Sequence, residues 1–371
     1  MRIVYITPLY LPWVGGLEVI CSQLLAELRQ RGHDVAVITA VNDTVTPLGL
    51  VEIEGIPVLR ADPYRAIGSQ SPSELLRVRR QVSSFVEDFG ADVVHAHDPS
   101  PLLWIYQRLA PRRRPLILTI HVVLSRHDPS LLQAAVKLMH EVDWVTGVSD
   151  DVVNDILSYA PALGDRISMV RNGARPPGPP PGPLPDGPVE LLCVGRLVTQ
   201  KGFDLALDAL AILVRERKDI HLSIAGEGPC FNDLAAQIER LGLSEHATLL
   251  GRVEHDRIGE LMAASTIVVM PSRWEGLPLV VLEAAHMERP VVGTDAPGLG
   301  SAIEDGVTGL VVPEEDSESL AGALIRLIDD RDEARAIGRR ARAAALRNSS
   351  IGACADQYER LYERFAGLRV A

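Results

Sequence analysis

Short apolar runs alternate with longer helical segments along this chain, and the alternation occurs twice, so few folds remain open. In the first half the runs RIVYI, VAVIT, DVVHA, PLILTI and WVTGV are rich in Val and Ile. After Gly187 the runs ELLCVG, HLSIAG, ATLLG, TIVVM, PVVGT and TGLVV follow. Continuous apolar strands between helices indicate parallel sheets covered on both faces. The sequence therefore predicts an α/β protein with two doubly wound, Rossmann-like domains.

A proline-rich segment, Arg171 to Pro188, separates the two sets of strands. Its eight prolines between Pro176 and Pro188 exclude a helix or a central strand and favour extended polyproline conformations. We therefore expect a semi-rigid linker over residues 173–188, between an N-terminal domain over residues 1–172 and a C-terminal domain over residues 189–350. Such domains would face each other across a cleft, where small ligands usually bind.

The last predicted helix, within residues 351–371, carries Tyr358, Tyr362 and Phe365 at helical spacing. Aromatic side chains bury much apolar area when they pack. The stripe indicates that this helix docks against another part of the chain, and we expect it to complete the N-terminal domain.

Composition and charge exclude several classes of protein. Of the 371 residues 47% are apolar and 23% charged, which permits a large core and excludes a disordered chain. The net charge is -12, with most of the acidic excess after residue 172, so we expect no nucleic-acid partner. The four cysteines have no zinc-type spacing, and neither a signal-peptide layout nor a membrane-spanning apolar run is present. These features predict a cytoplasmic protein with reduced thiols.

Ligands of open parallel sheets bind beyond the carboxyl ends of the strands, so the loops after strands are the candidate sites. The first such loop ends in Gly15 and Gly16 at the start of a helix. Paired glycines let the backbone approach a ligand closely, and the helix N-terminus offers amides to a phosphate. A plain turn before a helix needs the same residues. The loop lacks the GxGxxG pattern, and no acidic residue follows VAVITA, which counts against a dinucleotide fold.

The second loop, VGRLVTQKGFD, carries Arg196 and Lys201 just before a helix that begins near Phe203. A guanidinium fork and an ammonium group beside helix amides would bind a diphosphate well. For an isolated pair of cations, however, solvated surface charges would be the better interpretation.

The third loop, PSRWEG, carries Glu275, and Glu283 lies in the second turn of the helix that follows, with Pro278 expected at the first helical position. Carboxylates repel phosphate, so in a site for an anionic ligand they would meet hydroxyl groups instead. A ribose or hexose diol fits, because one carboxylate can accept two O–H hydrogen bonds.

Histidines end two strands of the first half. His95, His97 and Asp98 could suggest a metal site, but three ligands within four residues of extended chain rarely converge, so structural or pocket histidines are favoured and no metal is expected. His121 is the better functional candidate, because its strand should point at the cleft.

Together these segments resemble the family 4 retaining glycosyltransferases of the GT-B fold (glycosyltransferase group 1). The likeness covers nearly the whole chain and rests on GGLE with LAELRQRGHDVAVIT, DVVHAH, TIHV, VGRLVTQKG, EGLPLVVLEA, PVVGTDAPG and EDGVTGLVVP. The two glutamates of EGLPLVVLE, together with the Arg and Lys of the GRLVTQKG loop, form a specific combination.

The resemblance implies a role for each candidate residue. Arg196 and Lys201 would hold the donor diphosphate, Glu283 the ribose hydroxyls, Glu275 the sugar hydroxyls near C3 and C4, and His121 would lie beside the anomeric centre and the C6 hydroxyl. The catalytic candidates are thus His121, Arg196, Lys201 and Glu275. The resemblance also implies that further residues bind the donor, in the loops and helix starts that follow strands: Gly15, Gly16, Arg252, Val253, Gly276, Leu277, Pro278 and Leu279.

Three positions depart from the family pattern. Pro278 stands where the family often has Gly, which removes one N–H from the phosphate cradle and leaves the amides of Leu277 and Leu279. Ser301 replaces a usual Glu, and the usual hinge PNGVD appears as RNGAR.

The resemblance further implies transfer of a hexose or aminosugar from a UDP- or GDP-linked donor to an acceptor hydroxyl, with retention and without a metal or other cofactor. The acceptor would be a small molecule, a lipid or a glycan. Neither glutamate is expected to act as a nucleophile, since the departing phosphate would take the acceptor proton from the same face. Two alternatives stay open: a sugar-nucleotide epimerase on the same architecture, and a non-catalytic nucleotide-sugar binding subunit.

A group of basic residues lies in the first half: Arg77, Arg79, Arg80 and Arg112 to Arg114. A solvated basic face is the favoured interpretation. The alternative is a weak peripheral contact of the N-terminal domain with anionic lipid at the inner membrane face.

Overall fold

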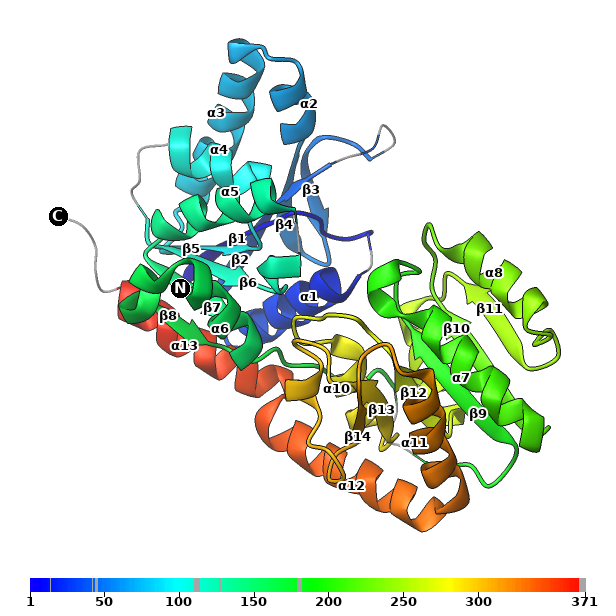
Figure 1. Ribbon diagram of the computed structural model, residues 1–371. Coiled ribbons are helices and arrows are strands. Elements are labelled where there is room, and N and C mark those ends of the chain that lie inside the picture. The colour runs from blue at the N-terminus through cyan, green and yellow to red at the C-terminus, as the bar shows by residue number, and fades with distance from the viewer. Residues whose placement is uncertain are drawn as a thin grey trace. The chain divides into compact units, whose positions relative to one another are not determined.

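The computed structural model describes residues 1–13, 15–41, 43, 46–109, 114–126, 128–178 and 182–366, apart from the side chains of Leu109 and Asp256. The chain divides into two compact units, one formed by Met1–Asn172 with Ile351–Ala371 and the other by Gly173–Ser350 (Figure 1). Arg112 and Arg113 of the basic group lie outside the described residues, whereas Arg77 is exposed and pairs with Glu74 at 2.9 Å. No helix within the described ranges is long and apolar enough to cross a membrane.

The first unit contains an eight-stranded sheet in the order β3-β4-β2-β1-β5-β6-β7-β8. Its strands are β1 (Arg2–Thr7), β2 (Asp34–Ala40), β3 (Gly49–Ile53), β4 (Ile56–Ala61), β5 (Val93–His97), β6 (Leu116–Ile120), β7 (Trp144–Gly147) and β8 (Ile167–Met169). All neighbours are parallel except β3, which is antiparallel to β4. The runs quoted above as strands all form strands, but β3, β4 and β8 were missed.

The missed hairpin departs from the predicted parallel arrangement for a local reason. Glu54 and Gly55 connect β3 to β4 and both have positive φ, 51° and 73°. A two-residue turn with positive φ at both positions matches the twist of an antiparallel pair. Edge strand β3 alternates between half-buried and exposed side chains, so it lacks the continuous apolar run that marks the inner strands.

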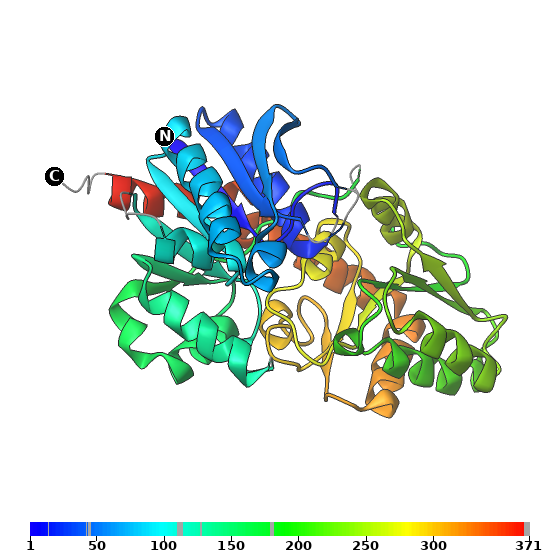
Figure 2. The ribbon, with the colours of Figure 1, turned by 90° about the horizontal axis from the view of Figure 1, so that it is seen from above.

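Helices cover both faces of this sheet. They are α1 (Gly16–Gln30), α2 (Pro63–Gly68), α3 (Pro72–Phe89), α4 (Pro101–Leu109), α5 (Pro129–His140), α6 (Asp150–Tyr159) and α13 (Ile351–Ala366), with 3₁₀ turns η1 (Leu124–Arg126) and η2 (Pro161–Arg166). Helices α1 and α13 lie side by side on one face, and α2, α3 and α4 lie on the other (Figures 1 and 2).

The aromatic residues of α13 are buried against the sheet of the first unit. Tyr358, Tyr362 and Phe365 belong to the same core cluster as Tyr5. The Tyr362 hydroxyl lies 2.6 Å from His95 Nδ1 and 3.1 Å from the Tyr5 hydroxyl. Helix α13 therefore packs against the sheet of the first unit, although the whole second unit separates it in sequence from the last strand of that sheet, Ile167–Met169.

The second unit contains a six-stranded parallel sheet in the order β11-β10-β9-β12-β13-β14. Its strands are β9 (Val189–Val194), β10 (Ile220–Ala225), β11 (Ala247–Gly251), β12 (Ile267–Met270), β13 (Val291–Thr294) and β14 (Leu310–Val312). Its helices are α7 (Phe203–Glu216), α8 (Phe231–Arg240), α9 (His255–Ala264), α10 (Leu279–His286), α11 (Ser317–Asp329) and α12 (Arg331–Asn348), with 3₁₀ turns η3 (Thr199–Lys201) and η4 (Gly300–Ala302).

Central strand β9 shows why this sheet must be covered on both faces. Leu191 and Cys193 pack in the cluster that contains residues of α7, α8 and α11, whereas Leu192 and Val194 pack in the cluster that contains residues of α9. Successive side chains of a strand point to opposite faces, so an apolar strand needs helices on both. The carboxyl ends of the parallel strands then present their loops at one edge.

Part of the proline-rich segment is attached to the second unit by one buried cation. Arg289 is 1% exposed, and its guanidinium donates to the backbone carbonyls of Met262 (2.9 Å), Ala263 (2.7 Å) and Gly182 (3.3 Å). A buried guanidinium is tolerated because these carbonyls satisfy its donors. Pro179, Pro180 and Pro181 of the predicted linker lie outside the described residues.

Candidate active site

The loop between β9 and α7 is shaped by Gly202. This residue has φ 63°, and a Cβ added to it would lie 1.9 Å from the carbonyl oxygen of Pro271. Only glycine permits both the left-handed backbone and this close approach. The loop that carries Arg196 and Lys201 is therefore packed directly on the start of the loop that carries Glu275.

This packing brings Lys201 to Glu275. Lys201 Nζ donates to Glu275 Oε1 at 2.6 Å, and the Ser272 hydroxyl donates to the same oxygen at 2.7 Å. The two charged side chains are only 14% and 6% exposed. The structure thus joins two of the residues that the sequence analysis placed in the site, although they are 74 positions apart.

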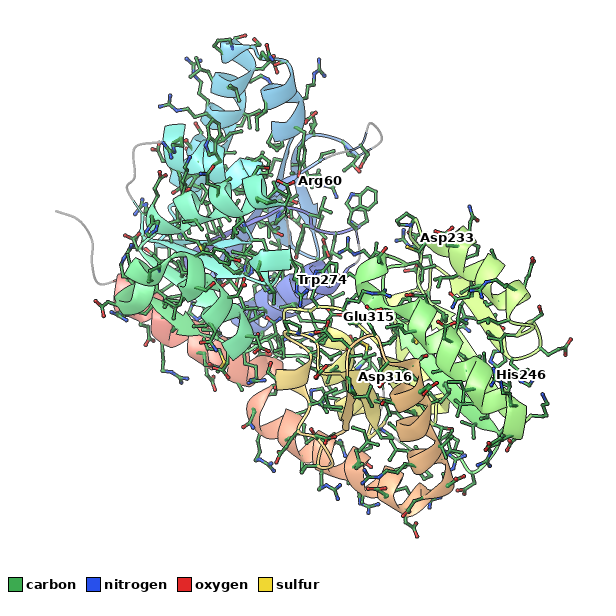
Figure 3. The ribbon with its side chains drawn as sticks, viewed as in Figure 1. Arg60, Asp233, His246, Trp274, Glu315 and Asp316 are labelled. Atoms are coloured by element: carbon green, nitrogen blue, oxygen red, sulfur yellow. The ribbon has the colours of Figure 1, made fainter. Side chains whose placement is uncertain are left out.

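Arg273 holds the same loop from the other side, and the sequence analysis missed it. Its guanidinium donates to the Thr199 carbonyl (2.6 Å), to both carboxylate oxygens of Asp204 (3.0 and 2.7 Å) and to Glu315 (2.5 and 3.1 Å). The hydrogen bonds with Asp204 and Glu315 raise the pKa of Arg273 above its ordinary value. Figure 3 labels Glu315 and Trp274, the residue that follows Arg273. No local signal marks such a residue, because its partners are distant in sequence.

Glu283 is buried, and one of its two carboxyl oxygens lacks a hydrogen-bond donor within the described part of the chain. Its side chain is 3% exposed, and Oε1 has no hydrogen-bond partner among the described residues. Burial raises the pKa of this carboxyl group to about 7. His255 Nε2 lies 3.7 Å from Oε1, so His255 is a second residue near the site that the sequence analysis missed.

The start of α10 differs by one residue from the prediction. Pro278 is the N-cap, with φ -70° and ψ 124°, and the helix begins at Leu279. The prediction that Pro278 occupies the first helical position was therefore wrong, because the backbone of Pro278 is extended rather than helical. Within the described chain, the amides of Leu277 and Leu279 make no hydrogen bond, so they stay available to a ligand.

The loop before α10 is also tied to the loop after β13. The amide of Glu275 donates to the carbonyl of Pro297 at 2.8 Å. Gly298 has φ 80°, and a Cβ there would lie 2.1 Å from the Glu275 carbonyl oxygen. Gly276 is buried in this contact region. The backbone around Glu275 is thus held by two neighbouring loops.

The remaining candidates of the second unit are more exposed. Arg196 is exposed, and its side chain has no hydrogen-bond or ion-pair partner in the part of the chain that the structure describes. Arg252 is half-exposed and lies 3.9 Å from Glu227 and 3.8 Å from Glu254. Val253 packs against the cluster that contains residues of α9. The structure does not join these residues to the Lys201–Glu275 pair.

The glycine pair of the first unit has two different environments. Gly15 is the N-cap of α1, and a Cβ there would lie 2.6 Å from Glu18 Oε2. Gly16 is the first helical residue, and a Cβ there would meet nothing within 4 Å. The close atom at Gly15 is the end of a flexible side chain, whereas Gly16 has open space, so backbone packing does not explain glycine at either position.

The two histidines of β5 make separate contacts. His95 uses both ring nitrogens, with the Tyr362 hydroxyl at 2.6 Å and the Thr119 hydroxyl at 2.7 Å. His97 Nδ1 lies 2.9 Å from His121 Nε2. Burial lowers the pKa of His95 and of His97 well below the ordinary value, and that of His121 to about 3.

Replacing Gly202 with alanine is expected to lower the free energy of unfolding by about 3 kcal/mol or more, because left-handed strain adds to a clash with backbone. Gly242→Ala is the matched control, since Gly242 has φ 69° but open space around its Cα. That control should cost only about 1–2 kcal/mol. Urea unfolding of both variants measures the difference, and equal losses would contradict the packing role of Gly202.

Comparison with known proteins identifies the family. The sequence model of the family described as Glycosyltransferase Family 4 matches residues 14–176, and that of Glycosyl transferases group 1 matches residues 179–344. The glycogen synthase of Mycobacterium tuberculosis is 31% identical to this chain over an alignment of 387 positions including gaps, which covers 94% of this chain and 91% of that protein.

Solved structures share the whole architecture. The sucrose-phosphate synthase of Thermosynechococcus elongatus has a TM-score of 0.84 at 19% identity, covering 98% of this chain and 99% of that one. The Anabaena protein HepE in complex with UDP-glucose has a TM-score of 0.80 at 21% identity, covering 98% and 100%. The chain therefore belongs to the family 4 glycosyltransferases of the GT-B fold.

Proposed function

We propose that this enzyme moves a hexose or aminosugar from a UDP- or GDP-linked donor to an acceptor hydroxyl, with retention of the anomeric configuration. The observation that carries the proposal is the buried Glu283, whose Oε1 lacks a hydrogen-bond partner among the described residues. A buried carboxylate oxygen without a donor is costly. A ribose hydroxyl would supply the missing donor.

The groups around the second unit's loops suit a diphosphate leaving group. Arg196 has an unpaired guanidinium, Lys201 supplies an ammonium group, and the amides of Leu277 and Leu279 are unbonded within the described chain. Fixed positive groups aimed at developing negative charge stabilise a transition state electrostatically. We propose that they do so without a metal ion, and turnover that persists in a chelator would support this.

Glu275 suits hydrogen bonding better than covalent catalysis. Its Oε1 already accepts hydrogen bonds from Lys201 and Ser272, which hold the carboxylate in place, and the ammonium group of Lys201 balances its charge. In our proposal Glu275 accepts hydrogen bonds from hydroxyls of the sugar, and the departing phosphate takes the acceptor proton on the same face. A sugar adduct trapped on Glu275 would contradict this mechanism.

The first experiment is a thermal-shift screen with UDP, GDP and ADP on the intact chain and on two variants. Glu283→Gln should reduce the shift at a given nucleotide concentration, and Glu260→Gln should keep it, because Glu260 is 70% exposed on α9. A ligand that binds only the folded state raises the melting temperature with its concentration. Absence of a shift with every nucleotide would sink the donor assignment.

The second experiment separates transfer from the alternatives. The enzyme is incubated with the sugar of the nucleotide that binds, with and without candidate acceptors, and the anomeric configuration of the product is read by NMR. Transfer with retention supports the proposal. An epimerised donor in the absence of acceptor would indicate an epimerase, and binding without any turnover would indicate a binding subunit.

A further inference from the structure

Two strands of the first unit bring two imidazoles into direct contact. His97 ends β5, and His121 directly follows β6. His97 Nδ1 and His121 Nε2 are 2.9 Å apart, which is a hydrogen-bond distance. The backbone amide of His121 also donates to Asp98 Oδ1 at 2.7 Å. Both the ring and the backbone of His121 are therefore held by consecutive residues of one strand end.

The position of the proton in this pair has two solutions. Burial lowers the pKa of both histidines, so both rings are neutral near pH 7. A neutral imidazole has one N–H donor and one acceptor nitrogen. Either His97 Nδ1 donates to His121 Nε2, or His121 Nε2 donates to His97 Nδ1.

The other nitrogen of His97 decides between them. His97 is 1% exposed, and its Nε2 is buried without a hydrogen-bond partner among the described residues. A buried N–H without a partner is rarer than an acceptor without one. The favoured arrangement therefore leaves Nε2 of His97 as the bare acceptor and puts the proton on Nδ1, which donates to His121.

We infer that His97 is a positioning residue that fixes His121 as the tautomer with its proton on Nδ1. His121 Nε2 is then occupied by the hydrogen bond from His97, and His121 can meet a substrate only as an Nδ1–H donor. Its ligand must accordingly be a hydrogen-bond acceptor, such as a hydroxyl oxygen of a sugar. The inference rests on the proposed function for its catalytic consequence.

Neighbouring groups keep the His97 ring in this orientation. The ring centroid of Tyr5 lies 4.6 Å from that of His97, and the centroid of His95 lies 4.2 Å from it. His95 is itself fixed by Tyr362 and Thr119, as described above. The His97 ring is therefore packed against two aromatic groups that cannot easily move.

The test reads the tautomer directly, by NMR of ¹⁵N-histidine-labelled protein without substrate. The His121 signals are assigned as those lost in His121→Gln. In the native enzyme we expect a protonated Nδ1 and a bare Nε2 on His121. In His97→Leu we expect that preference to be lost and kcat to fall by about 10- to 100-fold, as for other groups that orient a functional histidine.

The controls separate positioning from folding. The KM for the donor and the melting temperature are measured in parallel; a positioning role predicts a fall in kcat at nearly unchanged KM. His97→Asn offers an amide N–H in place of the Nδ1–H of His97. Relative to His97→Leu, it should restore kcat to the extent that NMR shows the Nδ1–H tautomer of His121. His140→Leu is the neutral control, since His140 is exposed at the end of α5.

The outcomes distinguish this inference from the proposed function. A native His121 with its proton on Nε2 would overturn the inference, and so would a kcat that does not follow the tautomer across the variants. If no donor supports transfer by the native enzyme, the proposed function fails, while the NMR spectra still decide where the proton lies.

Discussion

Lys201→Met is expected to lower kcat/KM for sugar transfer by about 100- to 1,000-fold, the usual effect of removing one preorganised group that stabilises developing charge. Lys201 Nζ lies 2.6 Å from Glu275 Oε1, so the change also leaves Glu275 without its cation. Breaking one side of a buried ion pair typically costs about 3–5 kcal/mol of stability. Steady-state kinetics and urea unfolding measure the two effects separately.

A double variant separates the two roles of Lys201. Lys201→Met with Glu275→Gln removes the unpaired charge, so the free energy of unfolding should recover while kcat/KM stays low. Glu275→Gln alone would show how much of the remaining defect belongs to the carboxylate. If Lys201→Met kept native turnover, the assignment of Lys201 to the diphosphate would be wrong.

Glu283→Gln is expected to stabilise the ligand-free enzyme above pH 7 and to reduce the thermal shift caused by nucleotide. Burial raises the pKa of Glu283 to about 7 in the folded state, above the ordinary value of 4.5. Between these two pH values the unfolded chain loses the proton while the folded chain keeps it, so the free energy of unfolding falls as pH rises. The whole shift corresponds to about 3 kcal/mol.

Thermal melts of the native protein and Glu283→Gln from pH 4.5 to 8.5 measure this difference. The stability of the variant relative to the native protein should grow across the window and level off above pH 7. Nucleotide affinity should fall by about 10- to 100-fold, the loss of hydrogen bonds to a charged group. If the difference in stability between the variant and the native protein were the same at every pH, the buried ionisation of Glu283 would be contradicted.

Residues of the candidate site were predictable from the sequence where a local pattern marks them. Glu275 lies in a loop after a strand, and Glu283 lies in the helix that follows, so the local pattern indicates where both are placed. Lys201 likewise lies in a loop after a strand. Arg273 and His255 were missed, because their contacts join segments that carry no common pattern. Arg273 meets Asp204 69 positions earlier and Glu315 42 positions later.

Local periodicity was enough to predict the strands at the centre of both sheets and the helices between them, because burial on both faces requires continuous apolar runs. It could not predict the antiparallel edge at β3, whose alternating side chains resemble a loop with polar positions. Nor could it predict that Tyr362 of the last helix would reach His95, 267 positions away. Hydrophobic pattern depends on neighbours in the chain, whereas the Lys201–Glu275 pair, the Arg273 contacts and the His97–His121 pair depend on which strand ends the fold places together.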